Sequence, residues 1–330
     1  MSIIIRPPCP KGTHPIETGI YTLATNEINK LYQKVANWID NRSPGGIVYS
    51  KPRVGKTKAI NFLYSALPKV FNAKLPIFSI LCREYRYPNE NRFFEDVLKD
   101  IEHSMISGKP NAKRDRIIRF FIDKTLASEQ NKILLFIDEA QRLRDIQYEW
   151  LMDIYNELES NGIILTAILV GQYELTNIRE TFIRANKRQI IGRFMSQEYK
   201  FHGIKNLKDI KTCLQGYDQN SEYPEDSGWS FTKYFFPDVF EEEGFRLENY
   251  AEDLFNVFEN LRSEANIKKA MNIPMQYITL TIEYILKHYG CDGSNLNQLS
   301  RVQWKEAIKN SGYIDAEIFE DLFNDEVSSA

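Results

Sequence analysis

A stretch of eight residues has the types and spacing that bind phosphate groups: Ser50-Lys51-Pro52-Arg53-Val54-Gly55-Lys56-Thr57. Backbone N–H groups of such a loop surround an anion, the Lys56 ammonium adds a mobile cation, and the Thr57 hydroxyl can bind Mg²⁺. We therefore expect this stretch and the adjoining Lys58 to hold the phosphates of a nucleotide. Ser50 stands where the phosphate-loop pattern has glycine, and serine disfavours positive φ. A small difference in loop geometry or nucleotide affinity is expected from that change.

A second group of reactive side chains follows an apolar run farther along the chain. Residues 133–137 are all apolar and lead directly into Asp138 and Glu139. A buried strand that ends in Asp places a carboxylate at the sheet edge beside the phosphate loop, where it can hold the Mg²⁺ shell. Glu139 is suited to polarise the water that attacks the γ-phosphate of ATP. Alternatively, the two carboxylates begin an ordinary solvated helix, which the helix dipole favours.

Apolar runs separated by amphipathic stretches must position these residues. The runs lie at 47–49, 77–82, 133–137, 163–170 and around 199–201. Their alternation with longer amphipathic stretches predicts an α/β fold, a parallel sheet of about five strands with helices on both faces. From residue 203 onward the pattern is helical.

The chain therefore divides into four predicted parts. They are an extended arm at 1–25, an α/β nucleotide-binding domain at 26–203, a smaller helical lid at 204–312 and an acidic tail at 313–330. Within the lid, residues 218–262 hold twelve acidic side chains, three basic ones and many aromatics. This composition is typical of an insertion or an elaborated first lid helix.

The composition excludes several classes of protein. The chain has 330 residues, 43% of them hydrophobic, which is too apolar for disorder, and a net charge of −3 does not fit a polybasic nucleic-acid coat. No apolar run reaches the roughly 20 residues of a membrane helix, and the N-terminus lacks the apolar region of about 7–15 residues that export requires. Four widely spaced cysteines predict reduced thiols in the cytoplasm. They are Cys9, Cys82, Cys213 and Cys291.

The phosphate loop, the intervening strand at 77–82 and the adjacent Asp138 and Glu139 together resemble AAA+ ATPases, over about residues 20 to 310. The resemblance implies that a polar residue after the strand at 163–170 senses the γ-phosphate. Gln172, which ends Leu169-Val170-Gly171-Gln172, stands at that position. Taken without the resemblance, Gln172 is equally an ordinary turn residue.

The same resemblance implies an arginine finger just before the last strand. Arg193, in Ile191-Gly192-Arg193-Phe194, would then reach the γ-phosphate held by a neighbouring subunit. Arg184 or Arg188 could hold this role instead, and the basic residues at 179–193 could also form a solvated helix face. For the second sensor of the lid, Arg262, Lys268 and Lys269 are open alternatives.

Two longer stretches narrow the resemblance: Ile137-Asp138-Glu139-Ala140-Gln141-Arg142-Leu143 and Ile168-Leu169-Val170-Gly171-Gln172-Tyr173-Glu174-Leu175. They look like the TnsC/TniB group of transposition regulators, which is related to the MuB-type target-selection ATPases. This resemblance implies a homo-oligomer, ring or helical filament, that assembles on duplex DNA with ATP and recruits a transposase. A target-selecting partner would recruit the oligomer in turn, and hydrolysis would control disassembly. The rival interpretations are a replication-type AAA+ loader and a nucleotide-binding scaffold with little turnover.

Local charge is consistent with non-specific DNA binding. Residues 109–119 carry a net charge of +4, and two arginines follow the second predicted strand. Contacts of such cations with phosphates are independent of base sequence and sensitive to salt. Alternatively, these side chains form a helix face that displays charge to water. The candidate residues are Arg83, Arg86, Lys109, Lys113, Arg114, Arg116 and Arg119.

Both terminal segments of the chain are expected to bind partner proteins. Residues 314–323 alternate acidic and bulky apolar side chains without Lys or Arg. They form either a docking peptide for another protein or a short helix that packs on the lid. The resemblance favours a transposase or nuclease partner here, with the proline-rich arm as a second contact surface.

Overall fold

The computed structural model describes residues 6–72 and 74–328, with the side chains of the last helix described as far as Asp321. These residues form two compact units. The α/β unit comprises Ile28–Pro52 and Lys56–Phe201. The helical unit comprises residues 6–27, Arg53–Gly55 and residues 202–328. Each unit has its own apolar core.

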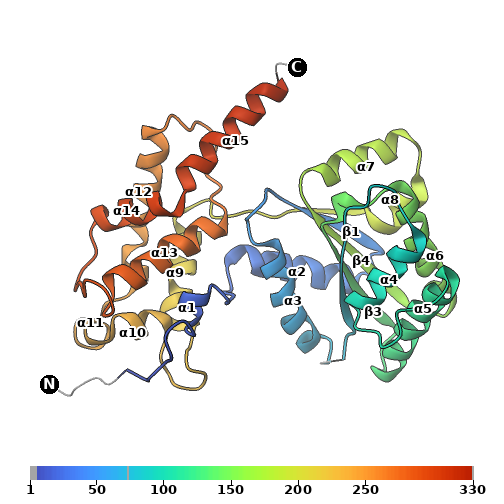
Figure 1. The fold of residues 1–330 in the computed structure, drawn as a ribbon, viewed down its shortest axis with the longest axis horizontal. Helices are drawn as coiled ribbons and strands as arrows, with labels where there is room; N and C mark the ends of the chain where they lie inside the picture. The colour runs from blue at the N-terminus through green and yellow to red at the C-terminus, as the bar shows by residue number, and fades with distance from the viewer. Residues whose placement is uncertain (1–5, 73, 329–330) are drawn as a thin grey trace. The chain divides into compact units, whose positions relative to one another are not determined.

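The α/β unit is built on a five-stranded sheet in which every pair of neighbouring strands is parallel (Figure 1). The order β2-β3-β4-β1-β5 places β4 between the two strands that carry the predicted motifs. The predicted fold is therefore confirmed. The strands are β1 (Gly45–Tyr49), β2 (Ile77–Leu81), β3 (Lys132–Asp138), β4 (Ile164–Gly171) and β5 (Gln197–Lys200).

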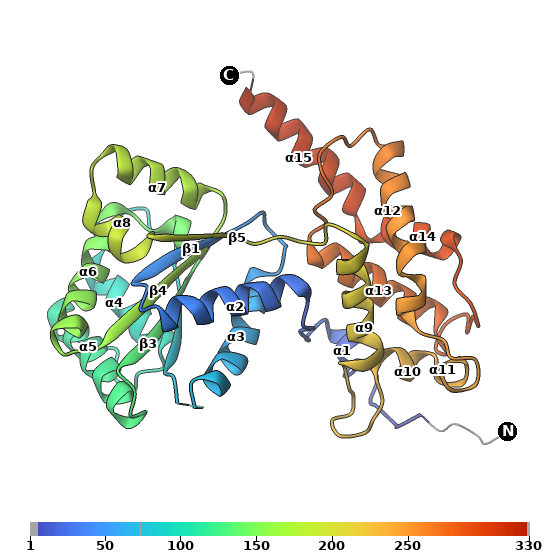
Figure 2. The same ribbon diagram turned by 180° about the vertical axis from the view of Figure 1, so that it is seen from behind.

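Helices cover both faces of this sheet, as Figures 1 and 2 show. Along β3, Ile133, Leu135 and Ile137 pack into the core formed with α4, α5 and α6, while the alternating residues Leu134 and Phe136 are buried on the opposite face of the sheet. Burial on both faces explains why the strands are continuous apolar runs. The helices are α2 (Asn26–Asp40), α3 (Lys56–Val70), α4 (Glu90–Asp100), α5 (Pro110–Ala127), η1 (Ala140–Arg142), α6 (Asp145–Ser160), α7 (Glu174–Arg184) and α8 (Arg188–Phe194).

The helical unit packs around a core rich in aromatic side chains. Phe231, Tyr234, Phe235 and Phe236, which lie in the stretch predicted as an insertion, are all buried in that core. The acidic and aromatic stretch is thus structural, because its aromatic rings supply much of the apolar surface that the unit buries. Its elements are α1 (Pro15–Thr18), α9 (Leu207–Gln219), α10 (Phe231–Phe235), α11 (Pro237–Glu242), η2 (Leu247–Tyr250), α12 (Ala251–Glu264), α13 (Met275–Tyr289), α14 (Arg301–Ser311) and α15 (Tyr313–Ser328).

The N-terminal segment differs from the predicted extended arm. His14 caps the short helix α1 through a capping box, and Ile16 is fully buried in the helical unit's core. The His14 ring lies 4.4 Å from the Tyr234 ring and also contacts Phe231 and Phe235. Residues 14–16 are anchored because the His14 ring contacts aromatic rings of α10 and the Ile16 side chain is buried in the core of the helical unit. The local sequence does not reveal these partners.

The C-terminal stretch begins inside the same core. Tyr313 is fully buried, and the carboxylate of Glu317 lies 3.1 Å from the guanidinium of Arg262, with both side chains buried. Of the two alternatives for this stretch, packing on the helical unit therefore describes residues 313–317. The side chains of residues 322–330, which belong to the predicted tail, lie outside the described part of the chain.

Candidate nucleotide-binding site

The predicted phosphate loop connects the end of β1 to the start of α3. Arg53 and Gly55 have positive φ angles of 64° and 106°, so the backbone turns sharply just before Lys56 opens the helix. Ser50 has no positive φ, and a glycine is therefore not required at its position. Val54 is buried, Lys51 and Gly55 are half-buried, and Pro52 and Lys58 are exposed.

The Lys56 ammonium is held by oxygen atoms of this loop. It lies 3.3 Å from the Ser50 carbonyl, 3.0 Å from the Ser50 hydroxyl and 3.0 Å from the Lys51 carbonyl. Burial lowers the pKa of Lys56, and the carboxylates of Glu139 and Asp138 only partly oppose that shift. A buried cation without a full counter-charge is stabilised by an anion, which is the property a phosphate-binding lysine needs.

Asp138 ends β3 beside the first turn of α3. The Thr57 hydroxyl donates to Asp138 Oδ2 at 3.2 Å, and the Glu139 backbone N–H donates to Asp138 Oδ1 at 2.9 Å. Burial raises the pKa of Asp138 in spite of these hydrogen bonds. A divalent cation would stabilise this buried carboxylate, and two adjacent oxygen donors are ligands of the kind Mg²⁺ prefers. Thr57 and Asp138 therefore fit the predicted metal site.

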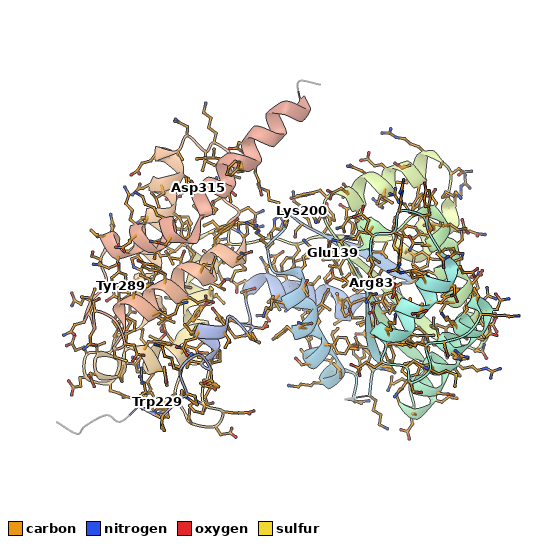
Figure 3. All side chains as sticks on the ribbon, viewed as in Figure 1. Arg83, Glu139, Lys200, Trp229, Tyr289 and Asp315 are labelled. Atoms are coloured by element: carbon orange, nitrogen blue, oxygen red, sulfur yellow. The ribbon has the colours of Figure 1, made fainter. Side chains whose placement is uncertain are left out.

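Glu139, which Figure 3 labels in the α/β unit, has an unusual backbone conformation. Its φ and ψ angles are 53° and 35°, in the left-handed region, which costs a residue with a side chain on the order of 1 kcal/mol or more. Such strain persists only where the surrounding structure holds the residue in place, and it is commonest at functional sites. This left-handed conformation of Glu139 lets η1 begin immediately after β3 ends.

The Glu139 carboxylate has two polar neighbours on η1. Gln141 Nε2 donates to Glu139 Oε2 at 2.8 Å, and the Arg142 guanidinium lies 3.6 Å from the same oxygen. Gln141 also accepts a hydrogen bond from the backbone N–H of Gln172 at 3.2 Å. The side chain of Gln141 thus connects the predicted catalytic base to the residue predicted as sensor. No sequence pattern assigned a role to Gln141, although this residue stands two positions after Glu139.

The predicted arginine-finger candidates lie on α7 and α8, and they differ in their partners. Arg193 is half-buried, with its guanidinium 2.8 Å from Glu159 and above the Tyr155 ring, 4.4 Å from the ring centre. Arg184 is highly exposed beside Glu180, 3.7 Å away. Arg188 is also exposed and donates to the Asn186 side chain at 2.8 Å.

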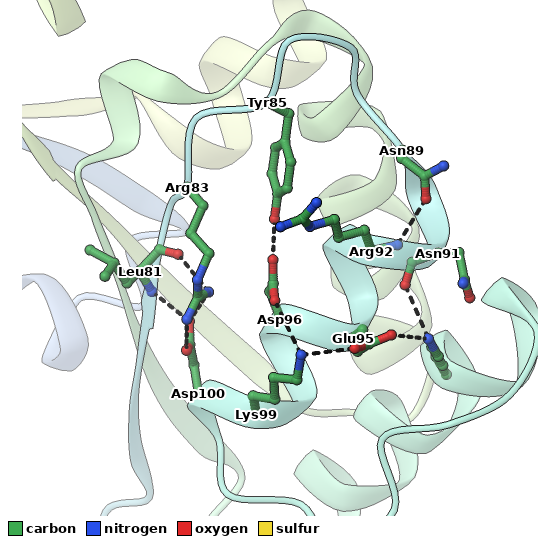
Figure 4. A network of polar contacts seen from close by, with 11 residues as sticks. Leu81, Arg83, Tyr85, Asn89, Asn91, Arg92, Glu95, Asp96, Lys99 and Asp100 are labelled. Atoms are coloured by element: carbon green, nitrogen blue, oxygen red, sulfur yellow. Dashed lines mark hydrogen bonds and ion pairs between the residues drawn. The ribbon is translucent and has the colours of Figure 1, made fainter.

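Several of the predicted DNA-binding residues instead pair within the α/β unit. Arg83 makes two hydrogen bonds to Asp100, at 2.7 and 3.1 Å, in the network that Figure 4 shows. Lys113 is only 1% exposed and pairs with Glu95 at 2.9 Å, so its ammonium does not lie on the surface. These pairs cancel part of the basic charge that the sequence displays.

The other members of the predicted set vary in exposure. Arg114 pairs with Asp153 at 2.8 Å, and Arg116 donates to the Ser107 carbonyl. The remaining three side chains are exposed: Arg86, Lys109 and Arg119.

The residues left open as second sensors lie in the helical unit. Arg262 is 5% exposed and donates to the Tyr313 hydroxyl at 2.6 Å as well as to Glu317. Lys269 is surrounded by the carboxylates of Glu317, Glu320 and Asp321 at 3.0 to 3.4 Å. Both side chains thus take part in holding α15. Lys268 is exposed.

Comparisons with known proteins agree with this architecture. Residues 40–178 match the family model described as an AAA domain, a span that contains the loop at 50–58, Asp138, Glu139 and Gln172. No curated protein matched the chain. No helix among the described residues is long and apolar enough to cross a membrane.

Three solved structures of low sequence identity are similar to this chain to different degrees. The Aeropyrum pernix ORC2 protein, solved as ADPNP–ADP complexes, is 13% identical, with a TM-score of 0.53 over 90% of this chain and 71% of that one. Drosophila ORC bound to DNA is 11% identical, with a TM-score of 0.47 over 91% and 67%. The A. pernix ORC1 protein in complex with DNA is 11% identical, with a TM-score of 0.42 over 91% and 84%. The match of residues 40–178 to the AAA domain model, the five parallel strands and the likeness to the A. pernix ORC2 structure together show an α/β fold of the kind that AAA+ phosphate-loop NTPases have.

Proposed function

We propose that the protein binds ATP with Mg²⁺ and hydrolyses it to ADP and phosphate. One observation carries this proposal: Lys56, Thr57, Asp138 and Glu139 meet at the carboxyl ends of β1 and β3. In this arrangement Lys56 and the loop N–H groups bind the phosphates, and Thr57 and Asp138 hold the Mg²⁺, which neutralises phosphate charge. Glu139 accepts a proton from the attacking water.

Two substitutions separate binding from turnover. Lys56→Ala removes the buried cation and is expected to abolish binding of a fluorescent ATP analogue. Glu139→Gln keeps the shape of the side chain but removes the base, so binding persists while phosphate release falls about 10²- to 10⁴-fold. Equal binding by the wild-type protein and Lys56→Ala would contradict the assignment of the loop.

We further propose that ATP binding drives assembly of a homo-oligomer on duplex DNA, which links target selection to transposase recruitment, and that hydrolysis controls disassembly. The motif at 137–143 and the stretch at 168–175 support this role. Exposed Arg86, Lys109 and Arg119 supply cations for sequence-independent phosphate contacts. Repetition of a modest patch along one duplex would strengthen binding.

Salt-dependent DNA binding tests the role of the exposed cations. Replacing Arg86, Lys109 and Arg119 together by alanine should weaken ATP-dependent binding and make the slope of log K against log salt shallower by about 2 to 3. The matched control removes three basic residues from α14 and should leave that slope unchanged: Arg301, Lys305 and Lys309. Equal effects of the two triple variants would count against this surface. Binding without ATP would contradict nucleotide-controlled assembly.

Hydrolysis in the oligomer should require an arginine from the neighbouring subunit, and Arg193 is the proposed finger. To reach a neighbour it must leave Glu159, whereas Arg188 and Arg184 are already exposed. Alanine at the true finger should remove the rise of specific ATPase activity with protein concentration and leave nucleotide affinity unchanged. If Arg188→Ala or Arg184→Ala removes the concentration dependence of the activity and Arg193→Ala does not, the residue whose substitution removes it is the finger.

A replication-type loader and a scaffold with little turnover are the rival functions. Phosphate release measured with and without duplex DNA separates a DNA-responsive ATPase from a scaffold. Capture of purified transposase by the ATP-bound protein on DNA separates the transposition role from that of a loader, which would bind a helicase or a clamp.

A further inference from the structure

The side chain of Gln141 occupies the space between the Glu139 carboxylate and the end of β4. Its two hydrogen bonds determine which way round the amide lies. The backbone N–H of Gln172 can only donate a hydrogen bond, so the amide atom that faces it is Oε1, the acceptor. Nε2 therefore faces Glu139 Oε2 and donates a hydrogen bond to it. The donor and acceptor of a single amide thus join two parts of the proposed catalytic site.

The shape of the end of β4 also fits this arrangement. A Cβ atom added at Gly171 would lie 2.2 Å from Gln141 Oε1 and 2.8 Å from a methyl carbon of Leu175. Both distances are far inside van der Waals contact, so the Gln141 amide can approach the strand only because residue 171 has no side chain. Gly171 has no positive φ and is needed here for space rather than for its backbone conformation.

The second polar neighbour of Glu139 on η1, Arg142, is less suited to hold the carboxylate. Arg142 lies 3.6 Å from the carboxylate, beyond hydrogen-bond distance, and its side chain is 43% exposed. A partly hydrated arginine at that distance contributes little orientation. The Gln141 amide, at 2.8 Å, is therefore the group that sets the direction of the carboxylate.

We propose that Gln141 is a positioning residue, which holds the Glu139 carboxylate in place and ties it to the end of β4. This role rests on the proposed function, because it presumes that Glu139 is the catalytic base. A displacement of Gln172, whose side chain is the proposed γ-phosphate sensor, would move its N–H group and hence the amide that holds Glu139. The presence of the γ-phosphate would thereby be communicated to the base through one side chain.

The first test compares two variants of Gln141 with a control at Arg142. Gln141→Leu keeps most of the volume and removes both hydrogen bonds, and Gln141→Glu places a second carboxylate against Glu139. We expect phosphate release at saturating ATP to fall about 10- to 100-fold in Gln141→Leu and further in Gln141→Glu, since a misplaced base costs rate rather than binding. The dissociation constant of a fluorescent ATP analogue should stay within about twofold, and Arg142→Gln should retain most of the rate.

A second test uses Gly171 to reach the same amide from the other side. Gly171→Ala should slow phosphate release by displacing Gln141, and the double variant Gly171→Ala/Gln141→Leu should be no slower than Gln141→Leu alone. Amide exchange should show reduced protection of the Gln172 N–H in both single variants. If Gly171→Ala does not fold, because of the contact with Leu175, the Gln141 variants still decide the question.

The outcomes distinguish this proposal from the proposed function. A wild-type protein that binds ATP but releases no phosphate refutes the proposed function, and the role of Gln141 with it. A wild-type protein that turns over ATP, with Gln141→Leu at an equal rate, refutes the positioning role alone. A rate loss in Gln141→Leu that is matched by an equal loss of nucleotide affinity also refutes it, because the side chain would then act on binding.

Discussion

Protonation of His14 should weaken the helical unit at acid pH. The ring is 1% exposed among the rings of Tyr223, Phe231, Tyr234 and Phe235. Its Nδ1 accepts a hydrogen bond from the Ile16 backbone N–H at 3.1 Å, so the neutral ring carries its proton on Nε2. A second proton on Nδ1 would break that bond and place a charge in an apolar site.

The size of the effect follows from the pKa. Burial lowers the pKa of His14 from 6.5 to about 4, with the charge of Glu17 opposing the shift and that of Arg6 adding to it. The unfolded chain therefore takes up a proton below about pH 6.5 while the folded chain does not until about pH 4. Stability is complete above this window and falls as the pH decreases, by about 2 kcal/mol at about pH 5.

Two variants isolate this titration from packing and capping. His14→Phe keeps a ring in the aromatic cluster, and His14→Asn keeps an acceptor for the Ile16 N–H. Urea unfolding followed by tryptophan fluorescence, near pH 7.5 and near pH 5, gives the pH dependence of stability for each protein. We expect both variants to lose about 2 kcal/mol less than the wild type between these conditions. Parallel losses in all three proteins would refute the reasoning.

Three further predictions concern the site and the last helix. Burial raises the pKa of Asp138, so its ionised form destabilises the nucleotide-free protein, and stability falls as the pH rises from the ordinary Asp value through the raised pKa. Asp138→Asn should therefore raise the melting temperature measured by calorimetry near neutral pH, and it should abolish Mg²⁺-dependent phosphate release. Ser50→Ala removes one of the three contacts that hold the Lys56 ammonium away from a phosphate, so ATP should bind up to about tenfold more tightly in a fluorescence titration. Glu317→Ala leaves the Arg262 guanidinium buried without its carboxylate and should cost about 3 kcal/mol in urea unfolding, whereas a loss below about 1 kcal/mol would mean that the pair is solvated.

The architecture of the α/β unit and the position of its proposed nucleotide site follow from local patterns in the sequence. Runs such as 133–137 are apolar at every position because both faces of a parallel strand are buried, and the pattern needs no long-range information. The loop at 50–57 and the pair Asp138 and Glu139 come directly after β1 and β3. Carboxyl ends of parallel strands lie along one edge, so the sequence alone brings these residues together.

Tertiary structure decided which of the polar side chains have partners. The basic residues at 109–119 look alike in the sequence, yet Lys113 is buried against Glu95 from α4 while Arg119 is exposed. The side chain of Gln141 is joined to the proposed site by a hydrogen bond from Gln172, thirty-one positions away at the end of β4. Glu317 finds its partner, Arg262, on α12. Helical periodicity and composition determine which face of an element is apolar. The partner of a charged or amide group depends instead on which elements the fold places against it, and only the assembled structure contains that information.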